Sequence, residues 1–226
     1  MKNENYLLNL HKIIPLWYED VQFYKKLNNP IEISSFQADP DNIQPINTEK
    51  AEISGAEIEL RKNIFFNLIH NLNLGLNASY LHSKAYIAGE ELNSRLNNLR
   101  DNEKLIQSNG EYYRQMQGQA PYIINLSLSY QNKDLGLQTG LYYNVQGETL
   151  SIVSMNSNPD IYTEPFNSLN FNLNKKINSH FSLGISLRNI LDQNKTMSTD
   201  SYGAKKEVFR SYSAGKFFGI KINYQI

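Results

Sequence analysis

The histidines, acids and serines of this chain could carry out metal or acyl-transfer chemistry only if their spacing brought them together. His11, His70, His82 and His180 form no HxH, HxxxH or HExxH pattern, the spacings that place two imidazoles on one metal. The segment "DPDN" at 39–42 lacks the spaced ligands of a calcium loop and is typical of a turn. Cysteine is absent, which excludes disulfides, cysteine-ligated zinc, iron–sulfur clusters and cysteine nucleophiles. We therefore expect no catalytic residues, no metal site and no cofactor, and we predict that the protein is not an enzyme.

One polar segment has the residue types of a ligand contact. Residues 88–118 are rich in Asn, Glu and Gln, and they include Arg95, Arg100, Tyr112, Tyr113 and Arg114. Guanidinium and phenol groups bind polar ligands by hydrogen bonding and stacking. We predict these five as possible ligand-contacting residues. The alternative interpretation is a mobile surface loop.

The charge balance and the apolar runs exclude other classes of protein. Lys and Arg number 22, as do Asp and Glu, so the formal net charge is zero. Nucleic-acid-binding proteins carry a basic excess to neutralise phosphates, so we expect no nucleic-acid partner. No run of apolar residues is long enough for a transmembrane helix. The first twenty residues do not have the form of a secretory signal.

From about residue 50 onward, apolar and polar residues alternate with a period of two, which predicts β-strands. The alternation holds over roughly 9–12 residues, the length of a tilted strand that crosses a bilayer. The polar faces carry Asn, Ser, Gln and Gly rather than Lys and Glu, which suits a watery lumen. We predict that the apolar faces contact lipid through Leu126, Leu128, Leu137, Leu141, Leu169, Phe171, Leu183, Ile185, Ile220, Ile222 and Tyr224.

The connections between these strands alternate between short and long. Tight links are expected near 63–67, 132–134 and 177–180, and long external loops at about 88–118, 147–160 and 193–211. Outer-membrane barrels have this arrangement, with short periplasmic turns and longer external loops. The sequence therefore predicts an all-β fold, an antiparallel meander that forms part of a transmembrane outer-membrane β-barrel. We expect an open partial barrel of about nine to ten strands.

Several local patterns in order resemble the barrel of TonB-dependent outer-membrane receptors, particularly those of Bacteroidota. They are "QFYKKLNNPIE", "NTEKAEISGAEIELRK", "LNLGLNASYLHSK", "RQMQGQAPYIINLSLSY", "SLRNILD" and the terminal "SYSAGKFFGIKINYQI". The resemblance covers roughly residues 20–226, whereas 1–20 are poorly defined. It implies that 1–226 form the C-terminal segment of such a barrel.

The resemblance implies a function in TonB-dependent uptake at the cell outer membrane, with a siderophore, cobalamin or glycan as the class of ligand. It also implies three partners: outer-membrane lipid, a plug domain and the energy-coupling protein TonB. The chain shows neither a plug nor a TonB box, so we expect a fragment of a receptor. Two alternatives stay open. One is a complete small barrel of about eight to ten strands that acts as a pore or adhesin, and the other is a soluble β-sandwich binding module.

Overall fold

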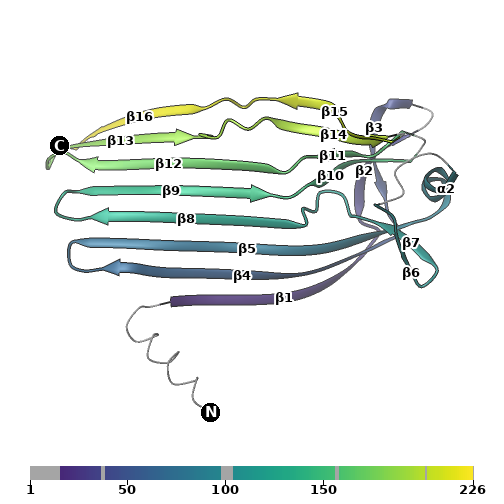
Figure 1. Cartoon of the computed structure of the whole chain (residues 1–226), viewed down its shortest axis with the longest axis horizontal. Helices are drawn as coiled ribbons and strands as arrows, with labels where there is room; N and C mark the ends of the chain where they lie inside the picture. The colour runs from purple at the N-terminus through teal and green to yellow at the C-terminus, as the bar shows by residue number, and fades with distance from the viewer. Residues whose placement is uncertain (1–15, 37–38, 98–103, 156–157, 202, 226) are drawn as a thin grey trace, which may run out of the picture.

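The computed structural model describes the chain except for residues 1–15, 37–38, 98–103, 156–157, 202 and 226. Almost all of its regular structure is β-strand (Figure 1). Eight strands follow one another across a large sheet, which we call the main sheet. From one edge to the other they are β1 (Leu16–Asn28), β4 (Lys50–Phe66), β5 (His70–Ile87), β8 (Tyr122–Asn132), β9 (Leu137–Gln146), β12 (Phe166–Lys176), β13 (Phe181–Arg188) and β16 (Phe217–Tyr224). The predicted antiparallel meander is confirmed for this sheet.

A second sheet lies at one end of the first, the right-hand end in Figure 1. Its six strands are ordered β15 (Ala204–Tyr212), β14 (Lys195–Ser201), β11 (Ile161–Thr163), β10 (Thr149–Ser154), β2 (Ile31–Phe36) and β3 (Asp39–Asn47). The same end holds the helix α2 (Gly89–Asn97) and the hairpin of β6 (Ile106–Ser108) and β7 (Glu111–Arg114), which joins the main sheet through β5. The segments predicted as long loops thus contain α2, β6 and β7, then β10, and finally β14 and most of β15.

The register of the main sheet defines its two faces. Leu128 pairs with Leu141, and Leu141 with Phe171, so these side chains project from the same face. The same pairing continues through Ile185 to Ile220. All eleven residues predicted to contact lipid share this face, and the alternate positions place Asn, Ser, Gly and Gln on the other.

Asparagine side chains shape the tight turns at the other end of the sheet. The Oδ1 atom of Asn67 accepts hydrogen bonds from the backbone N–H groups of Ile69 and His70, and Asn178 accepts from His180 and Phe181 in the same way. Such Asx turns reverse the chain in few residues. The first turn begins at Asn67, the last residue of the predicted link at 63–67, because β4 continues to Phe66 through an irregularity after Asn63.

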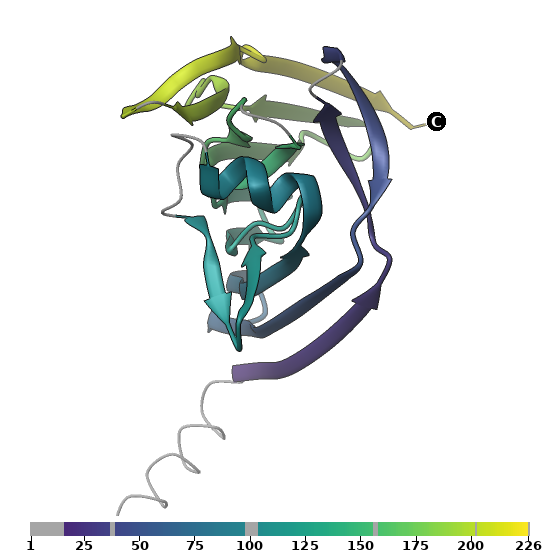
Figure 2. The same cartoon turned by 90° about the vertical axis from the view of Figure 1, so that its right-hand side faces the viewer.

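The sheet curves without closing among the described residues (Figure 2). β1 pairs only with β4, and β16 pairs only with β13. The prediction of an open partial barrel is therefore confirmed, and the complete small barrel would need a β1–β16 pairing that the described strands do not make. A sandwich would enclose the apolar face between two sheets, yet Ile220 and Ile222 are 61% and 70% exposed.

The buried core lies at the loop end of the molecule rather than along the strands. One cluster contains Ala51, Ile53, Ala85 and Met116, and a second contains Leu150, Val153 and Tyr162. The strand pairing departs from the meander at this end, because β10 pairs in parallel with β2 (Val153 with Ser34). Since β2 follows β1 along the chain and β10 follows β9, this pairing joins the loop ends of two strands that are not neighbours in the main sheet. It fixes the loop segments around the core. No helix in the described part of the chain is long and apolar enough to cross a membrane.

Candidate functional site

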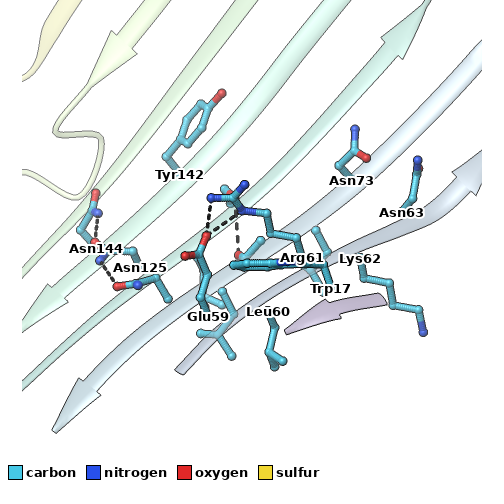
Figure 3. Close-up of a pocket in the computed structure, with 16 residues that line it drawn as sticks. Trp17, Glu59, Leu60, Arg61, Lys62, Asn63, Asn73, Asn125, Tyr142 and Asn144 are labelled. Atoms are coloured by element: carbon cyan, nitrogen blue, oxygen red, sulfur yellow. Dashed lines mark hydrogen bonds and ion pairs between the residues drawn. The ribbon is translucent and has the colours of Figure 1, made fainter. Parts of the chain in front are cut away.

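A hollow of about 610 Å³ lies on the polar face of the main sheet (Figure 3). A hollow on this face makes it the concave one, with the apolar face on the outside of the curve. The side chains that point into it come from β1, β4, β5, β8 and β9, and they include Trp17, Glu59, Arg61, Asn77, Asn125, Ser127, Tyr142 and Asn144. Adjacent strands, rather than a loop, thus position the wall of the hollow.

One row of paired residues gives the hollow its shape. Trp17 pairs with Arg61, Arg61 with Gly75, Gly75 with Ser127, and Ser127 with Tyr142. The Arg61 guanidinium lies 5.0 Å from the centre of the Trp17 ring. Gly75 and Ser127 form a low floor between the two aromatic residues, and a Cβ atom at Gly75 would lie only 2.5 Å from the Ser127 hydroxyl.

The neighbouring row is a chain of amides. Asn77, Asn125 and Asn144 occupy paired positions on β5, β8 and β9. The Nδ2 atom of Asn144 donates to Oδ1 of Asn125 at 2.5 Å, and that of Asn125 donates to Oδ1 of Asn77 at 3.3 Å. Each primary amide has two N–H donors and a carbonyl with two lone pairs, so this row keeps donors and acceptors for a ligand.

The hollow carries a charge pair with no formal net charge. Arg61 and Glu59 lie on β4 two residues apart, and Nη2 of Arg61 is 2.5 Å from Oε1 of Glu59. The side chains of Arg61 and Glu59 are 69% and 31% exposed to solvent, so the ion pair contributes little to stability. The two opposite charges cancel formally, so the pair gives the hollow no excess charge.

A second cluster of charged side chains is buried at the loop end. Arg114 on β7 donates from Nη1 and Nη2 to the carboxylate of Glu32 on β2, at 3.0 and 2.8 Å, and from Nε to Glu91 on α2 at 2.6 Å. Arg95, one turn further along α2, bridges Glu91 at 2.7 Å and Asp160 at 2.8 Å. We call these five residues the buried ion cluster. It joins β2, α2 and β7 to the segment between β10 and β11.

Burial and pairing oppose one another in the ionisation of this cluster. Burial raises the pKa of Glu32, but the hydrogen bonds and charge of Arg114, with donors from Thr48 and Gln117, hold that pKa below its ordinary value. Burial likewise disfavours the cation of Arg114, yet Glu91 and Glu32 raise the pKa of the guanidinium. Glu32 and Arg114 are therefore both charged at neutral pH.

The predicted ligand-contacting residues have different environments. Arg95 and Arg114 are buried in the ion cluster, and their polar atoms bind carboxylates of the same chain. Tyr113 is buried, packs edge-on against Tyr86 with ring centres 5.9 Å apart, and its hydroxyl donates to Glu111. Tyr112 is half-buried on β7, and Arg100 lies outside the described residues. Contact of this segment with a ligand stays a prediction.

The sequence analysis did not assign the residues of the hollow or the acidic members of the ion cluster. Glu32 gave one signal, as a charged residue in the otherwise uncharged strand "IEISSF". Trp17 lay in a segment without clear alternation, and its partner Arg61 is 44 positions away. The row from Trp17 to Tyr142 spans five strands, so it could be found only once their registers were known.

The histidines do not converge in the described part of the chain. His70 bonds through Nδ1 to the hydroxyl of Tyr130 at 2.7 Å, and His180 bonds to Ser179 at 2.9 Å. Within the described residues, no group of three or more His, Cys, Asp or Glu side chains could hold a metal ion.

Comparison with protein families gives one match. The family model described as TonB dependent receptor-like, beta-barrel, matches residues 23–190, from within β1 to just beyond β13. No curated protein and no solved structure matches the chain.

Proposed function

Because the chain belongs to the TonB-dependent receptor-like β-barrel family, we propose that it forms part of the wall of an outer-membrane receptor that imports a scarce nutrient. Members of this family are outer-membrane transporters, not enzymes. The function that we assign to this chain is accordingly to build the barrel wall and to hold the segments that select the ligand. It separates lipid from a polar lumen and holds the external segments that meet the ligand.

The observation that carries this proposal is the division of the main sheet into two faces. The apolar face is exposed to solvent in the isolated chain, with Leu126, Leu128 and Leu141 each 40% exposed. Contiguous exposed apolar surface marks a membrane or partner interface. Lipid covers this face in the proposed barrel, and all backbone groups within the membrane bond to neighbouring strands.

The two ends of the sheet support an orientation. The second sheet, α2 and the β6–β7 hairpin stand at one end, and the Asx turns at the other (Figure 1). In outer-membrane barrels the short turns face the periplasm and the longer segments face outside. We assign the buried ion cluster to the external end, where Tyr112 on β7 is the half-buried candidate for ligand contact.

The open edges of the sheet support a role within a larger wall. β1 and β16 each leave one edge unpaired among the described strands. An open edge within hydrocarbon would leave backbone groups without partners, so further strands must cover both edges. We propose that the described strands are one portion of a receptor barrel, whose lumen holds a plug domain coupled to TonB as in the family.

Labelling of intact cells tests this proposal. The chain has no cysteine, so single substitutions give unambiguous sites. Glu207→Cys in β15 and Asp134→Cys in a tight turn are both exposed positions at opposite ends of the molecule. In the receptor as the cell makes it, a membrane-impermeant maleimide should label Glu207→Cys on intact cells. It should label Asp134→Cys only after the outer membrane is permeabilised. Equal labelling of both sites, or recovery of the protein in the soluble fraction, would contradict the proposal.

A further inference from the structure

The hollow on the concave face has the chemical character of a site for a polyhydroxylated ligand. We propose that it binds a neutral oligosaccharide, an inference that rests on the proposed function and specifies the class of nutrient. Sugar rings present apolar C–H faces and a rim of hydroxyl groups. A site for them therefore combines aromatic side chains with groups that both donate and accept hydrogen bonds.

The aromatic part of the site comes from Trp17 and Tyr142. Their side chains are 45% and 37% exposed, so both keep surface for a ligand. Figure 3 shows Arg61 stacked over Trp17, with Tyr142 standing across the hollow. Arg61 and Tyr142 are three strands apart in the register, so their backbones are separated by roughly 14 Å. That span accommodates about two or three sugar units.

The floor between these residues is low enough to admit a ring. Gly75 has no side chain and Ser127 has a small one. The close approach of a Gly75 Cβ to the Ser127 hydroxyl shows that any larger residue here would displace its neighbour or fill the space. The small residues thus keep the middle of the hollow open.

The polar part of the site is the amide row of Asn77, Asn125 and Asn144. Each amide spends only part of its hydrogen-bonding capacity on its neighbour, as the bonds along the row show. A sugar hydroxyl can accept from the remaining N–H groups and donate to the remaining lone pairs. A carboxylate or an ammonium group could use only half of these partners.

The charges of the site favour a neutral ligand. Glu59 and Arg61 neutralise each other across 2.5 Å. Lys62 pairs with Leu74 on β5 and so projects from the apolar face, which removes it from the polar lining. Among the described residues, Arg61 is therefore the one cation on the polar side of the hollow, and it is paired with Glu59, so an anionic ferric chelate or an acidic peptide would meet no excess positive charge there. A neutral sugar needs none.

Trp17 is the single tryptophan of the chain, which makes its fluorescence a direct reporter of the site. The full chain, kept in detergent micelles, is titrated with maltopentaose, xylopentaose and laminaripentaose. Oligogalacturonate of the same length serves as the charged comparison. We expect a saturable change in Trp17 emission with at least one neutral pentasaccharide, and at least tenfold weaker binding of oligogalacturonate.

Substitutions in and opposite the hollow test where the sugar binds. Ser127→Tyr fills the floor and Asn144→Ala removes one amide, and each should weaken binding at least tenfold. The matched control Leu126→Ala lies on the opposite face of β8 and should bind as the unmodified protein does. Circular dichroism verifies that each variant keeps its β-structure, and Asn144→Ala removes too little volume to disturb the sheet.

Three outcomes would overturn the inference. They are no response to any of the three neutral sugars, a response that survives both Ser127→Tyr and Asn144→Ala, and equal or tighter binding of oligogalacturonate. If a plug segment saturates the change in Trp17 emission and sugar has no effect, the result is the first of these outcomes. If the receptor labels in cells as proposed but one of these results is found, only this inference is lost. If the receptor fails the labelling test, the proposed function itself is lost.

Discussion

Nη2 of Arg114 lies 2.8 Å from Oε2 of Glu32, although 82 residues separate the two along the chain. Both side chains are at most 2% exposed. Arg114 is on β7, in the hairpin that follows α2, whereas Glu32 is on β2, the strand that crosses to β10. The pair therefore joins two segments that the main sheet does not hold together. With Glu91, Arg95 and Asp160 it fixes the loop end of the molecule.

Removal of Arg114 should open this end. Arg114→Leu leaves Glu32 buried without a cation, whereas Glu91 keeps its ion pair with Arg95. Breaking a buried pair in this way costs about 3–5 kcal/mol. Hydrogen exchange should show faster exchange of β2 and β7 and little change in β8 and β9. Arg210→Leu, at an exposed position whose cation lies over Tyr212, is the control and should cost under about 1 kcal/mol. Protection of β2 unchanged by Arg114→Leu would show that the buried ion cluster does not hold this segment.

Acid should release the same segment. Because the pKa of Glu32 is lower in the folded protein than its ordinary value of 4.5, its ionised form stabilises the fold above that value. This stability is lost as the pH falls through the lowered pKa. Protection of β2 against hydrogen exchange should therefore stay constant from pH 7 to 5 and decline below 4.5. Glu32→Gln should lower the protection of β2 at neutral pH and make that protection less dependent on pH. If the loss of protection in acid is unchanged in this variant, a group other than Glu32 causes it.

The two faces of β8 should differ in their tolerance of charge. Leu128→Arg places a cation on the apolar face near the middle of the strand, and Ser129→Arg places it on the polar face. In a bilayer the first should cost about 2–4 kcal/mol and the second much less. Urea titration of the whole receptor, folded into lipid vesicles, measures both. Equal costs would mean that lipid does not contact the Leu128 face.

The unpaired edge of β16 should make the chain depend on detergent. Ile220, Ile222 and Tyr224 are 60–70% exposed on a strand with one free edge. A long apolar edge pairs readily with other chains. Without detergent, light scattering should detect aggregates, and Ile220→Lys with Ile222→Lys should slow their growth. A monodisperse monomer without detergent would contradict the membrane assignment.

Alternation along the sequence was sufficient to predict the main sheet. In β8, Leu126 and Leu128 alternate with Asn125 and Ser127, and a period of two leaves only the choice of which face meets the core or lipid. The tight turns followed from Asn and Gly between strands. Asn67 shows the limit of that inference, because β4 runs on to Phe66 and moves the turn by a few residues.

The loop end was not predictable from local pattern. Segments rich in Asn, Glu and Gln gave no periodicity, and so α2 and the β14–β15 hairpin were expected as plain loops. The structure of these segments depends on ion pairs with residues distant in the sequence, such as Arg114 with Glu32 and Arg95 with Asp160. The parallel pairing of β10 with β2 arises in the same way. The row from Trp17 to Tyr142 needs four strand registers at once, which composition does not encode.

Site-directed spin labelling along β8 tests the central claim most directly. Single cysteines at 124–129 give one label at a time, since the chain contains no other cysteine. If the sheet is a barrel wall, labels at Ile124, Leu126 and Leu128 should be relaxed by oxygen, which concentrates in lipid. Labels at Asn125, Ser127 and Ser129 should be relaxed by a water-soluble nickel complex instead. Relaxation by nickel at Leu126 and Leu128, or no alternation along the strand, would contradict the assignment of this sheet to a membrane.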